Sequence, residues 1–547
     1  MKGLLTTLLS AALAIPFVHA LPRVTRTGKY LYDESGKRFF IKGIAYQEPG
    51  ELPTQTAEGE FPEPTTFIDP LSQPDACDRD IPYLRQLGVN AVRVYSVDAA
   101  ANHDHCMSVL SSAGIYTLID LSLPVNGSIT REDPTWTSNL LTLYLNTIEA
   151  FSKYDNVLGY NIGNEIVKDT ASTITAPFIK AAARDVKAYI KSKSYRGLVG
   201  YSSTDGTGWR DPLAHFLTCE SDDTSIDLWG LNDYRWCGTS TVSDSWQEAI
   251  TAFSDLPVPA YFSEYGCNRD TRTWSEVPAL YGTEMSAVFS GGVAFSYFPT
   301  NDAKSYGMVT VSGNTVTTSD EFTALATQLT GVTTIETPSQ SSVTTPSLPD
   351  CPSVSADWLG SSQLPPTPNQ AECDCIWRDS PCVFSPQTTN HAALFEELFQ
   401  SACTYLGTSG GSCTPIGQNG TTGTYGQISS CDGATKLTWI FSQYYLATNN
   451  NAQSCSFAGN ATVNSASPTS SSEVNAAVSS CFAATPSVYT PLTPSTTLSP
   501  VGANTGTSQP SGGGSTGGAV SIFADSRALL GVFIAMLCML GSGAMLL

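Results

Sequence analysis

Two carboxylates stand near the ends of two short apolar runs in this sequence. One run covers Val157 to Glu165, and the other covers Pro259 to Cys267 and carries Glu264. Both runs predict buried parallel strands that present an acid at their C-terminal tips. Cleavage of a glycosidic bond needs two such groups, one to protonate the departing oxygen and one to attack, or to activate water, from the opposite face. The pair therefore indicates a carbohydrate-active enzyme.

Alternating strand and helix patterns surround these two acids from Phe39 to about Thr300. The strand candidates are Phe39–Tyr46, Ala91–Val97, Tyr116–Leu123, Val157–Ile166, Leu198–Ser203, Asp227–Tyr234, Ala260–Tyr265 and Gly292–Phe298. Helical patterns between them include Ile81–Leu87, Asn139–Tyr154 and Ala176–Lys191. Eight strand–helix repeats in about 250 residues predict an α/β fold of the (β/α)8 TIM barrel type. An open doubly wound sheet is the alternative, but no glycine-rich phosphate loop follows the first strand.

Length, charge and cysteine content limit the class of protein. A chain of 547 residues is too long for one compact domain, so we expect at least two. Its net charge of −22 argues against nucleic-acid binding, which needs a basic surface. Fifteen cysteines indicate an oxidising compartment and disulfide bonds. We expect a monomer.

Both termini predict processing. A short basic start, an apolar stretch and small residues before position 20 are typical of a secretory signal peptide at 1–20. At the other end, small residues, a polar spacer and the uncharged apolar tail Ala528–Leu547 predict a glycosylphosphatidylinositol signal, with Gly517 as attachment residue and a propeptide at 519–547. Removal of this propeptide would discard Cys538 and leave fourteen cysteines. A transmembrane anchor is the alternative, disfavoured because no Lys or Arg follows the tail.

Composition divides the rest of the chain. We expect a catalytic barrel at 21–332, a linker at 333–365 that begins with a Ser/Thr/Pro-rich stretch, and a cysteine-rich module at 366–483. Residues 484–518 are rich in Ser, Thr, Pro and Gly and predict a disordered, O-glycosylated stalk. Asn126, Asn419 and Asn460 lie in candidate N-glycosylation sequons.

Five segments carry a more specific resemblance. The segments Phe40–Gln47, Asn90–Tyr95, Tyr160–Glu165, Leu231–Tyr234 and Tyr261–Cys267 resemble the fungal β-1,3-glucanosyltransferases of glycoside hydrolase family 72. The likeness covers most of residues 25 to 330. It implies a retaining mechanism with Glu165 as acid/base and Glu264 as nucleophile, about 5–5.5 Å apart.

The resemblance also implies binding roles. Asn164 would hydrogen-bond the 2-hydroxyl of the sugar under attack, and Tyr234 would orient Glu264. The residues implied to line the donor and acceptor subsites are Gln47, Tyr95, Asp120 and Tyr297. For the tyrosines the alternative is core packing with a satisfied hydroxyl, and for Asp120 it is a loop cap. Arg93 fits a buried structural charge paired with an acid.

The implied reaction is a two-step transfer in which Glu264 takes up a β-1,3-glucan and Glu165 then activates the non-reducing-end hydroxyl of a second glucan. A retaining endo-β-glucanase or mannanase is one alternative, and a non-catalytic wall-binding protein is another.

The His103-Asp-His105-Cys106 sequence suggests a metal cluster, but a loop with a disulfide-bonded cysteine is the better interpretation. We infer no metal and no cofactor. The expected partners are glucan chains and, through the lipid anchor, the outer face of the plasma membrane or the cell wall.

The cysteines follow the same resemblance. In the barrel it implies the pairs Cys77–Cys106 and Cys237–Cys267, and it implies that Cys219 reaches Cys351 and clamps the linker. The eight later cysteines resemble carbohydrate-binding module family 43, which implies the pairs Cys373–Cys431, Cys375–Cys481, Cys382–Cys455 and Cys403–Cys413. Spacing alone leaves about 105 pairings open for eight cysteines.

Overall fold

The computed structural model describes residues 20–51, 64–124, 127–300, 305–388, 394–482 and 486–496. Residues 1–19 of the predicted signal peptide, Asn126, Gly517, the apolar tail and most of the stalk lie outside these residues. Within them, no helix combines the length and the apolar character needed to cross a membrane.

Eight parallel strands close into a barrel. They are β3 Ile41–Ala45, β4 Ala91–Val94, β5 Tyr116–Asp120, β6 Val157–Asn164, β7 Leu198–Thr204, β8 Leu228–Asp233, β9 Ala260–Tyr265 and β10 Phe289–Ala294. Strand β10 pairs with β3 on one side and with β9 on the other, which completes the ring. The predicted (β/α)8 barrel is therefore confirmed, and the open sheet is excluded.

The last strand differs from its predicted range of Gly292–Phe298. It begins at Phe289 and ends at Ala294, because the chain then leaves the ladder. Tyr297 and Phe298 continue the apolar pattern, but they pack against Tyr46 in the turn that follows. The apolar residues after Ala294 are therefore buried, but they do not pair as part of the strand.

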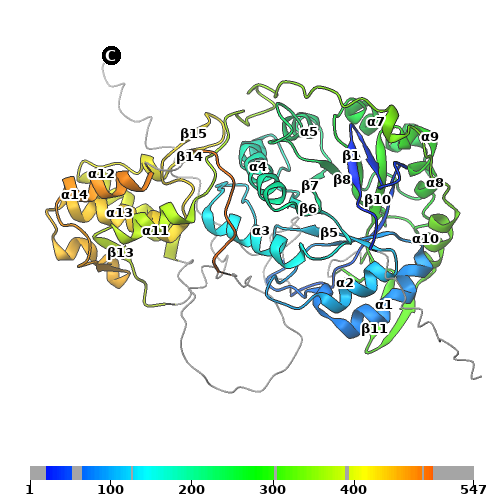
Figure 1. Cartoon of the computed structure of the whole chain (residues 1–547), viewed down its shortest axis with the longest axis horizontal. Helices are drawn as coiled ribbons and strands as arrows, with labels where there is room; N and C mark the ends of the chain where they lie inside the picture. Colours follow the sequence, from blue (N-terminus) through cyan, green and yellow to red (C-terminus); the bar gives the residue numbers. More distant parts are fainter. Residues whose placement is uncertain are drawn as a thin grey trace, which may run out of the picture.

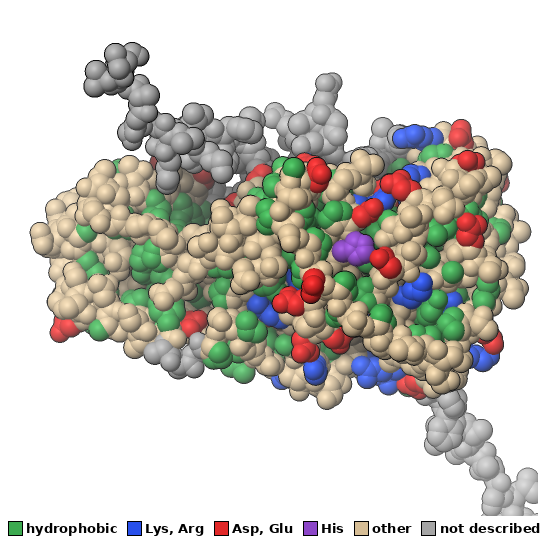
Figure 2. All heavy atoms as spheres, turned by 90° about the horizontal axis from the view of Figure 1, so that it is seen from above, with side chains coloured by type: hydrophobic (Ala, Val, Ile, Leu, Met, Phe, Trp, Pro, Cys, Tyr) green, Lys and Arg blue, Asp and Glu red, His purple; other side chains and the backbone are tan. Residues whose placement is uncertain are grey.

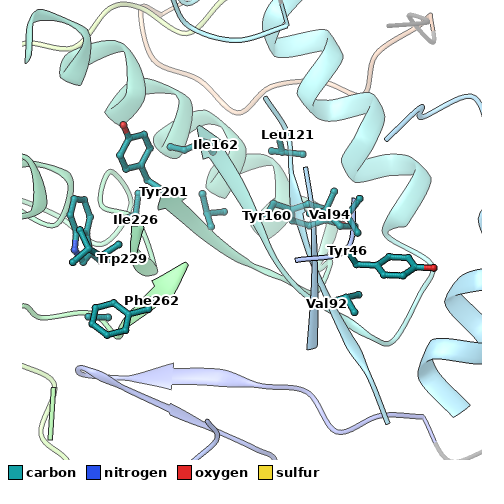
Figure 3. Close-up of a cluster of buried hydrophobic side chains, with 14 of the residues drawn as sticks. Tyr46, Val92, Val94, Leu121, Tyr160, Ile162, Tyr201, Ile226, Trp229 and Phe262 are labelled. Carbon is teal, nitrogen blue, oxygen red and sulfur yellow. The ribbon is translucent and has the colours of Figure 1, made fainter. Parts of the chain in front are cut away.

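Helices cover the outside of the barrel (Figure 1). They are α1 Pro74–Leu87, α2 Asp104–Ser112, α3 Ser138–Phe151, α4 Ala176–Lys193, α5 Arg210–Leu217, α6 Val242–Ser245, α7 Gln247–Phe253, α8 Glu276–Leu280, α9 Thr283–Ser286 and α10 Asp320–Gly331. Two short 3-10 turns, η1 Pro70–Ser72 and η2 Ala171–Thr175, precede α1 and α4. Outward side chains of the strands, among them Val92, Ile162 and Trp229, form the fully buried layer beneath the helices (Figure 3). Such strands need apolar residues on both faces, which explains their nearly continuous apolar runs.

An N-terminal hairpin closes one end of the barrel. Strands β1 Thr25–Thr27 and β2 Tyr30–Tyr32 pair antiparallel. The fully buried Leu31 of this hairpin packs in one cluster with Ile41, Leu118 and Leu228. Two of these three residues begin their strands, so the hairpin covers the N-terminal ends of the strands and leaves the C-terminal ends for chemistry. A second hairpin, β11 Val309–Ser312 with β12 Thr315–Thr318, follows β10.

The C-terminal module has its own core. Its elements are α11 Gln370–Arg378, β13 Cys382–Phe384, α12 Phe395–Thr408, η5 Thr414–Ile416, β14 Gln418–Asn419, β15 Thr424–Tyr425, α13 Gly433–Ala447, η6 Ala452–Cys455, η7 Phe457–Gly459, β16 Ala461–Val463 and α14 Ser471–Phe482. Leu437, Ile440 and Phe441 of α13 are fully buried at its centre. On the face seen in Figure 2, charged side chains gather over the barrel and are sparse over the module.

Seven disulfides join the pairs that the resemblance implied. Three lie in the barrel and linker, namely Cys77–Cys106, Cys219–Cys351 and Cys237–Cys267. Four lie in the module, namely Cys373–Cys431, Cys375–Cys481, Cys382–Cys455 and Cys403–Cys413.

The module packs against the α3 and α4 side of the barrel. The backbone N–H of Ser138 donates to the carbonyl of Ser430 at 2.9 Å. The ring of Phe178 meets that of Tyr425 edge to face, with centroids 5.7 Å apart. Beyond the module, the segment 486–496 returns to the barrel, where Asn146 donates to the carbonyl of Thr496 at 3.1 Å. Contacts from within the module and from the segment after it therefore hold the two units together.

Candidate active site

Arg93 of β4 lies at the centre of the site, and its side chain is fully buried. Its Nη2 donates to Asp120 Oδ2 at 2.7 Å and to Asn164 Oδ1 at 2.9 Å. Its Nη1 donates to Glu264 Oε1 at 3.1 Å. A guanidinium offers five N–H donors in one rigid plane, so it can hold several acceptors in fixed positions at once. The interpretation of Arg93 as a buried charge paired with an acid is therefore consistent with its contacts.

Glu264 sits in β9 and accepts two further hydrogen bonds. Tyr95 donates its hydroxyl to Oε1 at 2.8 Å, and Tyr234 donates its hydroxyl to Oε2 at 2.7 Å. Burial raises the pKa of the Glu264 carboxyl to about 7, against the opposing effect of Arg93. The negative charge of Glu165 adds to the rise, and the two tyrosine hydroxyls oppose it.

The Tyr234 hydroxyl is suited to a donor role. Burial, and then the charge of Glu264, raise the pKa of Tyr234 well above its ordinary value. The hydroxyl therefore keeps its proton and can donate to Glu264. The resemblance implied that Tyr234 orients Glu264, and this hydrogen bond is the contact through which it would do so.

Glu165 follows the end of β6 in a left-handed backbone conformation, with φ of 52°. Such a conformation is uncommon for a residue with a side chain and costs free energy. Three contacts hold it: the N–H of Glu165 donates to the carbonyl of Ser202 at 2.8 Å, and Arg131 donates to the carbonyls of Glu165 and Ile166 at 2.6 and 2.9 Å. Strain at an acid in a strand-end position supports a functional role.

Register shifts precede both acids. Along β6 and β7 the pairing shifts between Asn161 and Asn164, and along β8 and β9 it shifts at Asn232, which lies opposite Glu264. A bulge of this kind re-aims the following side chain and is over-represented beside active sites. A register shift in the strand pairing therefore precedes each of the two acids.

In the described part of the chain, the hydrogen bonds of the Asn164 side chain all involve its amide oxygen. Its Oδ1 faces donors from Arg93 and from Asn232, the latter at 3.2 Å. Arginine can only donate, so the atom facing it must be the amide oxygen. The Nδ2 group of Asn164 is left on the other side, as a donor. This orientation is compatible with a hydrogen bond to a sugar hydroxyl.

Two of the implied subsite residues differ from the prediction. Asp120 is 1% exposed, and its oxygens accept from Arg93 and, at 2.7 Å, from Asn161. Tyr297 is fully buried and donates its hydroxyl to Asp80 at 3.1 Å. Neither side chain lines an accessible wall, because one balances a buried guanidinium and the other is satisfied in the core. Asp120 therefore acts on the site through Arg93, whereas Tyr297 belongs to the core around Tyr46 and Asp80.

Gln47 and Tyr95 are the other two residues implied to line the subsites, and their contacts differ. Gln47 uses its Oε1 to accept from the backbone N–H groups of Tyr95 and Ser96, and its Nε2 donates to the carbonyl of Ile68 at 2.6 Å. It therefore anchors the loop that carries Tyr95. The half-buried ring of Tyr95 lies at the site itself, through its contact with Glu264.

Asn232 of β8 is a site residue to which the sequence analysis gave no role. Its Nδ2 donates to Glu165 Oε1 at 2.7 Å, and its Oδ1 accepts from Ser263 Oγ at 2.7 Å. The available signal was position: Asn232 comes two residues before Tyr234 near the end of one strand, so both side chains leave the same face.

The side chains of the histidine-rich sequence after β4 are engaged in separate contacts. His103 pairs with Asp69 at 2.7 Å, His105 pairs with Asp78 at 2.9 Å, and Cys106 is bonded to Cys77. Each potential ligand thus has a separate partner in the described structure.

A parallel (β/α)8 barrel with glutamates at the ends of its fourth and seventh strands defines the class of barrel enzymes that act on glycosidic bonds. Residues 17–333 match the family profile Glyco_hydro_72, described as Glucanosyltransferase, and residues 380–462 match the X8 domain. The chain belongs to the Glyco_hydro_72 family and carries an X8 domain.

Named relatives are similar along most of the chain. It is 40% identical over 445 residues to "1,3-beta-glucanosyltransferase gas1" of Schizosaccharomyces pombe, which covers 80% of this chain and 78% of the relative. It is 38% identical over 446 residues to "1,3-beta-glucanosyltransferase GAS2" of Saccharomyces cerevisiae, which covers 79% and 78%. A solved structure of a Saccharomyces cerevisiae Gas2p mutant in complex with laminaritetraose and laminaripentaose superposes with a TM-score of 0.74 at 35% identity, covering 85% of this chain and 99% of that one.

Proposed function

We propose that this protein is a β-1,3-glucanosyltransferase that cleaves a β-1,3-glucan donor and joins the new reducing end to the non-reducing end of another glucan. The observation that carries the proposal is the shared network of Glu165 and Glu264, connected through Asn232 and Arg93 at the C-terminal ends of the strands. Membership of a glucanosyltransferase family and the names of the relatives support the choice of reaction.

In the first step, a Glu264 oxygen forms a bond to the anomeric carbon while the bond from that carbon to the departing glucan oxygen breaks. The electron pair goes to the departing oxygen, which takes a proton from Glu165. This leaves a covalent glucan ester on Glu264, as in other retaining enzymes whose two carboxyl groups lie about 5–5.5 Å apart. Arg93 and the hydroxyls of Tyr95 and Tyr234 hold Glu264 in its ionised form and aim it.

In the second step, Glu165 acts as a base. It removes the proton from the non-reducing-end hydroxyl of an acceptor glucan, whose oxygen attacks the anomeric carbon and releases Glu264 as a carboxylate. The new bond has the configuration of the old one because two displacements have occurred. Asn164 donates from Nδ2 to the 2-hydroxyl, a contact that strengthens as positive charge develops on the sugar ring.

Hydrolysis is the competing outcome of the second step, since water can replace the acceptor hydroxyl. Incubation with a reduced laminari-oligosaccharide and sizing of the products separates the two. Products longer than the donor show transfer, and shorter products alone would show an endo-glucanase. A mannanase would leave the laminari-oligosaccharide intact.

A pair of variants tests the proposed roles. Glu264→Gln should abolish formation of the covalent ester, and Glu165→Gln should reduce cleavage of glucan by about 10²–10⁴-fold, the usual contribution of a general acid or base. Unchanged glucan processing by both variants would support a non-catalytic wall-binding protein instead.

We further propose that the protein is secreted and held by a glycosylphosphatidylinositol anchor at the outer face of the plasma membrane or in the cell wall. The signal-like residues 1–20 and the tail beginning at Ala528 support this, with Gly517 as attachment residue. Release of the protein from cell membranes by phosphatidylinositol-specific phospholipase C tests it. A protein that stays membrane-bound after this treatment would contradict the lipid anchor.

We propose that the X8 domain is a carbohydrate-binding module of family 43 within 366–483 and that 333–365 is a linker clamped by a disulfide. We also propose that N-glycans occupy Asn126, Asn419 and Asn460. Asn419 is exposed, and Cys351 ties the linker to Cys219. Binding of the intact protein to insoluble β-1,3-glucan, with and without an active-site inhibitor, tests the module. Mass spectrometry of tryptic glycopeptides tests the sequons.

A further inference from the structure

The amide of Asn232 can be oriented from its surroundings. Arg93 Nη1 lies 3.5 Å from one end of the amide, and Ser263 Oγ lies 2.7 Å from the same end. A guanidinium has no acceptor, so this end must be Oδ1. The other end, Nδ2, therefore faces Glu165 and Asn164.

Both hydrogens of Nδ2 are committed. One goes to Glu165 Oε1 at 2.7 Å and the other to Asn164 Oδ1 at 3.2 Å. The Asn164 oxygen already accepts from Arg93, so neither neighbour can rotate away without losing a partner. Asn232 itself is 2% exposed and is fixed by Ser263 from the adjacent strand. The amide is thus a rigid donor pointed at one oxygen of Glu165.

A carboxylic acid carries its proton on one oxygen only. The oxygen that accepts from Nδ2 serves best as the carbonyl oxygen, because a protonated oxygen is a poorer acceptor. The proton must then sit on Oε2, to which no hydrogen bond is recorded from the described residues. Glu165 is only half-buried, so Oε2 is the oxygen left for a ligand.

We propose that Asn232 is a positioning residue that fixes which oxygen of Glu165 carries the transferable proton. It holds Oε1 as the acceptor in both steps, so that Oε2 gives the proton to the departing oxygen and later takes it from the acceptor hydroxyl. This inference rests on the proposed function, because it takes Glu165 to be the acid/base and asks which of its oxygens carries the proton. It also explains why a buried amide links the strands of the two acids.

The donor's leaving group separates this role from a structural one. A glucan leaving group needs a proton as it departs, whereas 2,4-dinitrophenolate departs without one. Asn232→Ala should therefore lower kcat for a laminari-oligosaccharide about 10–100-fold with little change in KM, since the amide is buried and its loss acts on the proton transfer. The burst of 2,4-dinitrophenolate from a 2,4-dinitrophenyl β-laminarioside, which reports the first step alone, should fall less than about 3-fold.

Tyr234→Phe is the matched control, because its hydroxyl acts on Glu264, which must attack in both cases. This variant should slow the burst and the glucan reaction by similar factors. Equal losses on both donors for Asn232→Ala would overturn the inference and indicate that Asn232 only supports Arg93 and the nucleophile. Unchanged rates on both would overturn it too.

A variant of equal size guards against misfolding. Asn232→Asp keeps the shape and the contact with Arg93 but, when ionised, has no hydrogen to give to Glu165. It should show the same selective loss with glucan. If Glu165→Gln and Glu264→Gln were fully active, the proposed function itself would fail. If they were inactive while Asn232→Asp treated both donors alike, only the role of Asn232 would fail.

Discussion

Tyr234 donates its hydroxyl to Oε2 of Glu264 at 2.7 Å, on the opposite oxygen from the one bound by Arg93 and Tyr95. Both carboxylate oxygens of Glu264 therefore accept hydrogen bonds. Arg93 and Tyr95 donate to Oε1, and Tyr234 donates to Oε2. Each donor favours the ionised carboxylate, which burial disfavours. The balance of these effects gives the carboxyl a pKa of about 7.

The first prediction concerns this balance. Tyr234→Phe removes a donor to the carboxylate, so the pKa of Glu264 should rise further above its ordinary value. Because the attacking group must be ionised, the acidic limb of the kcat/KM profile should move to higher pH. The maximal rate should also fall about 10–100-fold, the usual worth of a hydrogen bond to a charged group. The measurement is a pH–rate profile.

Tyr144→Phe provides the matched control for that profile. Its buried hydroxyl donates to the carbonyl of Ile162 at 3.0 Å and does not touch Glu264. Its acidic limb should stay where the unmodified protein has it. A limb that moved to lower pH in Tyr234→Phe would contradict the proposed donor role.

The second prediction concerns the buried pair of Arg93 and Asp120. Arg93→Met should destabilise the barrel by about 3–5 kcal/mol, since it leaves the carboxylate of Asp120 buried without its cation. Adding Asp120→Asn to this variant removes the stranded charge and should restore much of the stability. Chemical unfolding of the single and double variants measures this. Activity should stay low in both, because Glu264 also loses its cation.

Equal stability losses in Arg93→Met and in the double variant would contradict this account. They would mean that packing, and not charge, sets the role of Arg93.

The sequence predicted those features that follow from local pattern. All eight barrel strands were found because parallel strands covered on both faces need continuous apolar residues, and the acids at their tips followed from that placement. In the structure Glu165 directly follows the fourth barrel strand and Glu264 lies in the seventh. These are properties of short segments, and a single sequence contains them.

Contacts between strands were not predictable in the same way. The role of Asn232 depends on a register shift between β8 and β9 and on an arginine 139 residues away in sequence. The burial of Asp120 and Tyr297 depends on partners from β4 and α1. The family resemblance could not show these partners, and it implied that both residues line the subsites. Such relationships exist only after the barrel has closed.

The third prediction concerns the disulfides. Reduction should loosen the module before the barrel, because four disulfides staple the module's small core, whereas the barrel has a large core. Each native disulfide typically contributes about 2–4 kcal/mol. Hydrogen exchange in a titration with a thiol reductant should show α11 and α14 losing protection at reductant concentrations that leave β5 and β6 protected. Simultaneous loss in both units would refute the prediction.

The fourth prediction concerns the contact between module and barrel. Gly420 lies between β14 and β15, and a Cβ atom there would stand 2.0 Å from the carbonyl oxygen of Ile174 in η2. Neither backbone can absorb so close an approach without moving. Gly420→Ala should therefore push the hairpin off the barrel and destabilise the protein by about 1–3 kcal/mol. The measurement is the Tm, together with hydrogen exchange at η2.

Gly407→Ala is the matched control within the same module. It lies in α12, where a Cβ atom would meet nothing within 4 Å, and alanine is the better helix former by about 1 kcal/mol. Its Tm should be unchanged or slightly higher. If both variants lowered the Tm equally, the loss would come from the module's own folding. A lower Tm in Gly420→Ala alone, with faster exchange at η2, would show that the module stabilises the barrel through this one close backbone contact.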